Sequence, residues 1–160
     1  MVRLILLPAT DAHFAWMLDE PVIPPPLRLP RGGVDQPWVL RWLRRNLPDL
    51  EGTGSWLMVD GDEVVGLCSY KDPPDAAGAV DIGYAVAPAR RRRGYATAAV
   101  ALLIEAARAD PRLRRLTAET AVDNLPSQRV LEANGFHRTG RSHDVDEGEM
   151  IVWGLALDEA

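Results

Sequence analysis

Apolar residues follow two different spacings along this chain, and these spacings predict strands and helices. Short segments dense in apolar residues predict strands over residues 3–7, 55–59, 63–70, 79–87, 115–121, 136–141 and 149–157. Apolar residues three or four positions apart predict helices over residues 11–18, 37–47, 95–109 and 125–134. Residues at the helix ends agree with these ranges: Thr10 is a good helix cap, and Pro37 and Pro126 lie in first helical turns.

The order of these segments predicts an α/β fold with a mixed sheet, in a single domain over residues 1–160. The pair Asp60-Gly61 is typical of a hairpin turn, so segments 55–59, 63–70 and 79–87 form an antiparallel meander. A strand that continues through a helix into the next strand lies parallel to it, by a right-handed crossover. The chain of 160 residues has the length of one domain with an adequate core.

Two stretches are predicted to be loops. Residues 20–37 are rich in proline and contain the pair Gly32-Gly33, and the helix that follows is expected to end at Pro48. Residues 142–148 are polar and are expected to be a loop before the last strand. The large aromatic side chains of this half of the chain are expected in the core rather than in a pocket: Trp16, Trp38, Trp42 and Trp56.

A basic stretch joins the strand 79–87 to the helix 95–109, and it contains the candidate chemistry. Four arginines, 90–93, precede Gly94, which lies where the chain turns into the helix. The first N–H groups of a helix have no partner inside it, and with the helix dipole and nearby guanidiniums they bind anions. The lysine of a P-loop is absent, and of the three glycines of a dinucleotide loop only Gly94 is present. The stretch predicts a phosphate or pyrophosphate site, and the alternative is a solvated arginine run at a helix start.

The spacing Arg91-x-x-Gly94-x-Ala96 resembles the Arg/Gln-x-x-Gly-x-Gly/Ala signature of the GNAT superfamily of acyl-CoA-dependent N-acyltransferases. In that family the loop holds the pyrophosphate of coenzyme A. The position of the motif between a strand that ends in proline and a long amphipathic helix strengthens the resemblance.

A second motif lies downstream at the family's separation. Asn124 and Ser127, followed by an apolar helix and the pair Gly135-Phe136, are similar to the family's Asn-x-x-Ser/Ala and Gly-Phe pattern. With Ile-Gly-Tyr at 82–84, the closest branch is the one that includes ribosomal-protein alanine N-acetyltransferases. The resemblance covers about residues 55–157 and leaves the acceptor open.

The resemblance implies a GNAT fold in which the parallel strands near Val86 and Thr117 splay apart around the pantetheine arm of acetyl-CoA. It also implies the residues that contact this cofactor: Tyr84, Ala85, Val86, Arg91, Arg92, Arg93, Gly94, Tyr95, Ala96, Thr97, Asn124 and Ser127. For Asn124 the alternative is a helix cap.

Acyl transfer from a thioester to an amine needs a neutral amine, a stabilised oxyanion and a proton for the leaving thiolate. The resemblance implies direct attack in a ternary complex, with a backbone N–H near Val86 polarising the thioester carbonyl. Many relatives protonate the thiolate with a tyrosine at a position that is Leu131 here, so Ser127, one turn earlier, is the expected substitute. The alternative for Ser127 is hydrogen bonding at the helix start. Asp81 is the candidate base, through a water or as a ligand of the ammonium, and Glu119 is the alternative.

The composition of the chain limits the classes of partner and cofactor that it is expected to bind. A formal net charge of −5 disfavours nucleic acid, so the arginines are a local positive spot suited to a small polyphosphate. The only cysteine, Cys68, excludes an internal disulfide, and the three histidines have no ligand spacing, so no metal is expected. No apolar run is long enough for a membrane span, and a cytoplasmic protein is expected.

The acceptor is expected to be a small-molecule amine or a protein N-terminus. The acidic run 144–149 would attract a cationic amine or would simply be a solvated loop. A homodimer is expected because dimers are common among relatives. The first alternative is a non-catalytic acyl-CoA-binding or sensor domain, since the tyrosine is missing. The second is a nucleic-acid-binding module that uses the arginines.

Overall fold

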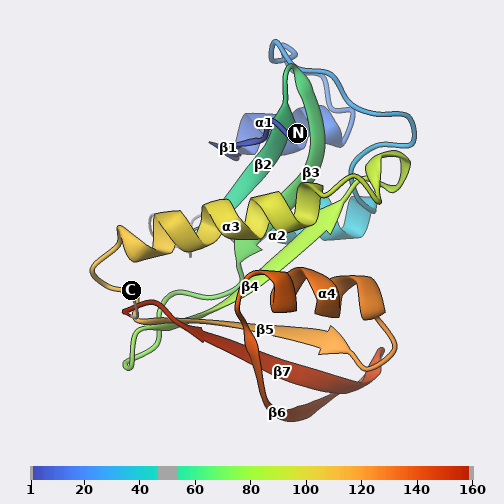
Figure 1. Ribbon diagram of the computed structural model, residues 1–160. Helices are drawn as coiled ribbons and strands as arrows, with labels where there is room; N and C mark the ends of the chain where they lie inside the picture. Colours follow the sequence, from blue (N-terminus) through green and yellow to red (C-terminus); the bar gives the residue numbers. More distant parts are fainter. Residues whose placement is uncertain (1, 47–53, 159–160) are drawn as a thin grey trace.

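The computed structural model describes residues 2–46 and 54–158, which form one seven-stranded sheet with helices on both faces (Figure 1). The order of the strands across the sheet is β1-β2-β3-β4-β5-β7-β6. The strands are β1 (Ile5–Pro8), β2 (Ser55–Asp60), β3 (Glu63–Tyr70), β4 (Ala79–Val86), β5 (Arg115–Ala121), β6 (His137–Asp144) and β7 (Gly148–Ala156). The helices are α1 (Asp11–Met17), α2 (Pro37–Asn46), α3 (Tyr95–Arg108) and α4 (Leu125–Ala133).

The predicted fold class is confirmed. The meander of β2, β3 and β4 is antiparallel, and β4 pairs with β5 in parallel through the crossover helix α3. Thr10 caps α1, as predicted, by accepting a hydrogen bond from the backbone N–H of His13. The predicted end of the second helix at Pro48 lies outside the described residues. None of the helices among the described residues has the length and apolar character that a membrane crossing requires.

Two hydrophobic clusters hold the helices against the sheet. On one face the apolar stripe of α3, including Ala99, Val100 and Leu103, is completely buried with Val80 and Ile82 of β4. On the other face, side chains of α1 and α2 pack against those of β2 and β3: Phe14, Leu40 and Leu43 with Leu57, Val59, Val64 and Leu67. The central strand β4 is therefore held on one face by α3 and along one edge by its pairing with β3.

The parallel strands β4 and β5 separate after a short contact. Their pairing is Ala79↔Arg115, Val80↔Leu116 and Asp81↔Thr117, although both strands continue beyond it. After Thr117, β5 stays paired with β7 on its other side. The opening between the two strands lies below the N-terminal end of α3 and beside α4, where Figure 1 shows β4 running to the upper right away from β5.

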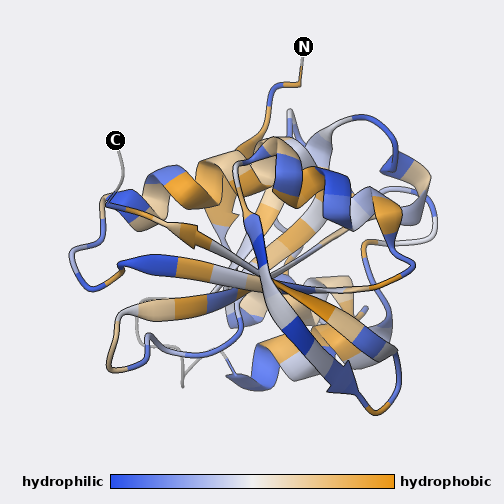
Figure 2. Ribbon diagram, turned by 60° about the horizontal axis from the view of Figure 1, so that its bottom comes forward, coloured by the Kyte–Doolittle hydropathy of each residue, from blue (hydrophilic) through white to orange (hydrophobic). Residues whose placement is uncertain are grey.

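Two expectations from the sequence are wrong. The predicted loop 142–148 is partly strand, because β6 continues to Asp144 before a tight turn into β7. This strand escaped detection because it is an edge strand with nearly every side chain exposed, so it shows no hydrophobic alternation; Figure 2 shows it as largely hydrophilic at the front. The tryptophans of α2 are not core residues either: Trp38 is 69% exposed and Trp42 is 39% exposed.

Candidate active site

The free edge of β4 presents backbone groups to the opening. Hydrogen bonds from Lys71 N to Asp81 O and from Ala87 N to Val65 O, both 2.8 Å, show that the odd-numbered residues of this segment bond to β3. Successive residues of a strand direct their backbone N–H and C=O groups to opposite edges. The groups of Tyr84 and Val86 therefore point away from β3, toward β5. In the described chain the pairing with β5 has already stopped at Asp81, so this edge is open.

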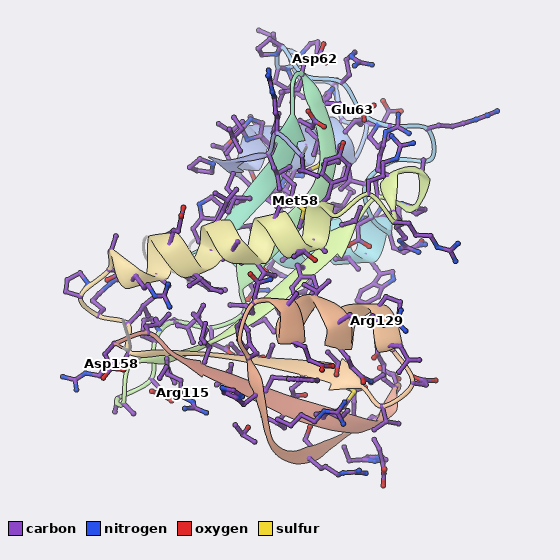
Figure 3. The ribbon with its side chains drawn as sticks, viewed as in Figure 1. Met58, Asp62, Glu63, Arg115, Arg129 and Asp158 are labelled. Carbon is purple, nitrogen blue, oxygen red and sulfur yellow. The ribbon has the colours of Figure 1, made fainter. Side chains whose placement is uncertain are left out.

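The arginine loop turns the chain from this edge into α3. A short 3-10 turn, Pro88–Arg90, follows β4, and Arg92 and Gly94 have positive φ angles of 65° and 84°. Gly94 is the residue immediately before α3, and a glycine is favoured there because the left-handed backbone strains any side chain. The turn is anchored by Arg90, whose guanidinium makes a two-point ion pair with Glu63 at 2.6 and 3.0 Å. Figure 3 shows Glu63 at the beginning of β3.

A groove of about 720 Å³ runs from the free edge of β4 to the first turn of α3. Most residues predicted to contact the cofactor line it: Tyr84, Ala85, Val86, Arg91, Arg92, Gly94, Tyr95, Ala96, Thr97 and Ser127. Arg93 and Asn124 do not line this groove. Instead, Asn124 accepts a hydrogen bond from the N–H of Ser127 at 3.3 Å, as the cap of α4.

Sequence reasoning missed one basic residue of the groove. Arg129 lies on α4 and lines the groove opposite the arginine loop (Figure 3). No described carboxylate forms an ion pair with Arg91, Arg92 or Arg129; Arg91 donates only to the carbonyl of Val86, at 3.2 Å. The guanidinium groups around the groove therefore remain available for an anion. The helical position of Arg129, two residues after Ser127, was the only local signal for it.

A second cavity of about 370 Å³ lies on the other side of the opening, beside α2. Its walls include Trp42 and Leu43 from α2, and Asp35 from the proline-rich loop. The two cavities share Tyr84, Ala85 and Ser127 in their linings. A molecule in the groove and a molecule in the second cavity would therefore meet at these residues.

A pair of hydroxyl groups marks this junction. The phenol Oη of Tyr84 lies 2.7 Å from Ser127 Oγ and donates at 3.2 Å to the Ser127 carbonyl. Burial raises the pKa of Tyr84, against the opposing effect of the Ser127 hydrogen bond. Leu131, at the position of the relatives' tyrosine, is completely buried and belongs to the core. The sequence pointed only to the backbone of Tyr84, so the side-chain contact is new.

The two predicted base residues lie in different surroundings. Asp81 lies at the base of the opening, where it accepts a hydrogen bond from Thr117 at 2.9 Å and pairs with Lys71 at 3.6 Å. Burial raises the pKa of this carboxyl, and Lys71 opposes the rise. Asp81 does not line either cavity, whereas Glu119 is exposed and lines the second one. The geometry brings Glu119, and not Asp81, to the cavity that also contains Tyr84 and Ser127.

The thiol of Cys68 is unsuited to act as a nucleophile in the second cavity. Cys68 lines the second cavity but is 2% exposed, and burial raises the pKa of its thiol to about 12. The reactive thiolate is therefore scarce at neutral pH. Among residues 2–46 and 54–158, no group of His, Cys, Asp and Glu is placed to hold a metal ion.

Comparison with known proteins identifies similar sequences and folds. The sequence model of the acetyltransferase (GNAT) domain family matches residues 3–137 of this chain. The uncharacterized N-acetyltransferase YjdG of Bacillus subtilis is 39% identical over 88 residues, which cover 54% of this chain and 52% of that protein. The chain thus spans about half the length of the curated relatives it matches.

Solved structures share the whole architecture. RimL, a ribosomal-protein alpha-N-acetyltransferase in complex with coenzyme A, has a TM-score of 0.75 at 19% identity, over 99% of this chain and 96% of its own. RimJ of Mycobacterium smegmatis, in complex with a coenzyme A disulfide, has a TM-score of 0.72 at 22% identity, over 96% of this chain and 81% of its own. At these identities the likeness shows the fold.

Proposed function

This chain belongs to the GNAT acetyltransferase family, and we propose that it transfers an acetyl group from acetyl-CoA to an amine. One observation carries the proposal: the free edge of β4 leads directly into a helix N-terminus beside Arg91, Arg92 and Arg129, with which no described carboxylate forms an ion pair. An extended chain with amide groups can add to a free strand edge, and a pyrophosphate suits a helix N-terminus with guanidiniums. The pantetheine arm and the pyrophosphate of coenzyme A offer these two groups joined together.

The residues of the groove divide this binding between them. The outward N–H and C=O groups of Tyr84 and the N–H of Val86 would pair with the amides of the pantetheine arm, while the Val86 carbonyl accepts from Arg91. The N–H groups of the first turn of α3, with Arg91 and Arg92, would hold the pyrophosphate. Arg129 lies across the groove and adds a positive charge for the phosphates.

The chemistry would take place at the junction of the two cavities. Acetyl-CoA supplies an acetyl thioester, and the backbone N–H near Val86 would polarise its carbonyl. The Ser127 hydroxyl lies at the junction and would donate toward the sulfur. Glu119 would accept a proton from the incoming amine, with Asp81 as a more distant alternative that orders Thr117 and Lys71.

The second cavity favours a cationic amine as the acceptor. Carboxylates from three separate segments line it, namely Asp35, Glu119 and Glu147, and no described residue forms an ion pair with them. Its one lysine, Lys71, is already paired with Asp81. A free ammonium group would therefore enter an acidic cavity with Trp42 as one wall.

Calorimetric titration with acetyl-CoA tests the proposal. We expect saturable binding that is weakened at least about tenfold in Arg91→Glu, because a charge-assisted contact is replaced by repulsion of the pyrophosphate. Arg108→Glu is the matched control, since it reverses the same charge at the opposite end of α3. Release of coenzyme A with a panel of amines then distinguishes an enzyme from a non-catalytic acyl-CoA-binding domain. A folded protein that does not bind acetyl-CoA would exclude both.

A further inference from the structure

The proposed transfer leaves a thiolate that needs a proton, and the expected donor position is occupied by Leu131. The chain has three tyrosines, and the structure separates their roles. Tyr70 packs edge-on against Trp56, with ring centroids 5.0 Å apart, and Tyr95 donates to Asp60 at 2.5 Å. Tyr84 alone among them lines both the groove and the second cavity.

The position of the Tyr84 phenol follows from the register of β4. Alternation places its side chain on the face of α3 and α4, where it packs beside the main core cluster. Its Oη reaches the first turn of α4 and lies 2.7 Å from Ser127 Oγ. The outward backbone groups of the same residue face the path expected for the pantetheine arm. Because Tyr84 lines both cavities, its phenol would lie where the groove meets the second cavity, at the place expected for the leaving sulfur.

We propose that the Tyr84 phenol, hydrogen-bonded to Ser127, is the proton donor to the departing thiolate. This inference rests on the proposed function and supplies the acid that Leu131 cannot. A hydroxyl from β4 therefore does the work of the tyrosine that relatives carry on the helix.

Acid strength favours tyrosine over serine. A phenol has an ordinary pKa of about 10 and a thiol one of about 8.5, so transfer from phenol to thiolate is uphill by about 1.5 pKa units. A serine hydroxyl is a far weaker acid and is better suited to supporting the phenol through a hydrogen bond. Partial burial raises the pKa of Tyr84 and so weakens it as an acid, while the Ser127 hydrogen bond opposes this rise by stabilising the phenolate that remains after transfer.

The proton balance of the step is closed. The amine nitrogen forms a bond to the acetyl carbon, the carbon–sulfur bond breaks, and the electron pair of the broken bond goes to sulfur. The phenolic proton moves to sulfur, and the Ser127 hydroxyl, 2.7 Å from Oη, donates a hydrogen bond to the phenolate that remains. The phenolate regains a proton from solvent, which receives the proton that the amine loses through Glu119.

The test uses coenzyme A, which carries the thiol product, and needs no acceptor. The pKa of the bound thiol is measured from thiolate ultraviolet absorbance in the wild type, Tyr84→Phe, Ser127→Ala and the control Tyr70→Phe. A hydrogen bond donated to a thiolate favours the charged form. We therefore expect Tyr84→Phe to raise the bound thiol pKa, lowering the thiolate-to-thiol ratio about tenfold at a given pH. Ser127→Ala should have a smaller effect, and Tyr70→Phe none.

The outcomes separate this inference from the proposed function. Coenzyme A bound with the same thiol pKa in Tyr84→Phe and the wild type would overturn the role of Tyr84 and leave the function intact. A larger effect of Ser127→Ala than of Tyr84→Phe would assign the donor to serine and would also overturn it. A folded wild type that does not bind coenzyme A would overturn both.

Discussion

The ion pair between Glu63 and Arg90 is expected to stabilise the fold and to hold the arginine loop in place. Its two contacts, 2.6 Å from Arg90 Nε to Glu63 Oε1 and 3.0 Å from Nη2 to Oε2, form a bidentate pair. The side chains are 12% and 26% exposed, for Glu63 and Arg90 respectively, so water screens them only in part. Exposed pairs contribute up to about 1 kcal/mol, and breaking a buried pair costs about 3–5 kcal/mol. We expect Glu63→Gln to lower the free energy of unfolding by an intermediate amount, about 1–2 kcal/mol.

The dependence on pH gives this prediction its sign. Hydrogen bonding to Arg90 holds the pKa of Glu63 below its usual value of 4.5. The folded state therefore favours the ionised carboxylate, and the stabilisation is fully present above the ordinary pKa. It is lost as the pH falls through the lowered value. The difference between the wild type and Glu63→Gln should be full at neutral pH and should disappear in acid.

Urea unfolding at a series of pH values measures this difference. Glu132→Gln on the exposed side of α4 is a matched control, since no described residue forms an ion pair with Glu132 and the change should be within about 0.5 kcal/mol of zero. A double-mutant cycle with Arg90→Gln isolates the coupling. Equal unfolding free energies at neutral pH, or a difference that does not change with pH, would refute the reasoning. Acetyl-CoA affinity in Glu63→Gln should also fall, because the 3-10 turn would lose its anchor to β3.

The remaining predictions concern the groove, the core and the second cavity. Gly94→Glu should abolish acetyl-CoA binding in calorimetry while circular dichroism still reports a folded protein, because it adds a strained, negatively charged side chain at a φ of 84°. Leu131→Ala should lower the free energy of unfolding by about 2–5 kcal/mol in urea titrations, since this side chain is completely buried. Putrescine, with two ammonium groups, should bind the protein–coenzyme A complex more tightly than butylamine, which has one, because Asp35, Glu119 and Glu147 line the second cavity. Added salt should reduce the difference by screening these charges. Glu119→Gln should reduce the turnover of the best amine about 100-fold without changing acetyl-CoA affinity, as expected for loss of a general base.

Each of these has a contrary result. Retained acetyl-CoA affinity in Gly94→Glu would show that the pyrophosphate does not bind at the start of α3. A small effect of Leu131→Ala would contradict its place in the core. Equal affinity for the two amines would show that the carboxylates do not recognise the acceptor. Full turnover in Glu119→Gln would show that Glu119 is not the base and would favour Asp81.

Local sequence was sufficient to predict the helices, most strands and the position of the arginine loop. Thr10 and Gly94 act on the backbone beside them, so the start of α1 and the start of α3 could be predicted without tertiary contacts. The arginine loop was predictable for the same reason, since its residues are consecutive. The edge strand β6 was not, because exposure on both faces removes the periodicity that identifies a strand.

The tertiary structure alone decided what meets at the site. Tyr84 and Ser127 are 43 positions apart, and their contact depends on the register of β4 and on how α4 packs. The convergence of Asp35, Glu119 and Glu147 on one cavity depends on three segments far apart in sequence. Residue spacing sets local backbone conformation and which face a side chain occupies, whereas distances between elements follow from packing of the whole sheet. Residue order along the chain therefore predicted the elements and the arginine loop, whereas the folded chain was needed to show which side chains line the two cavities.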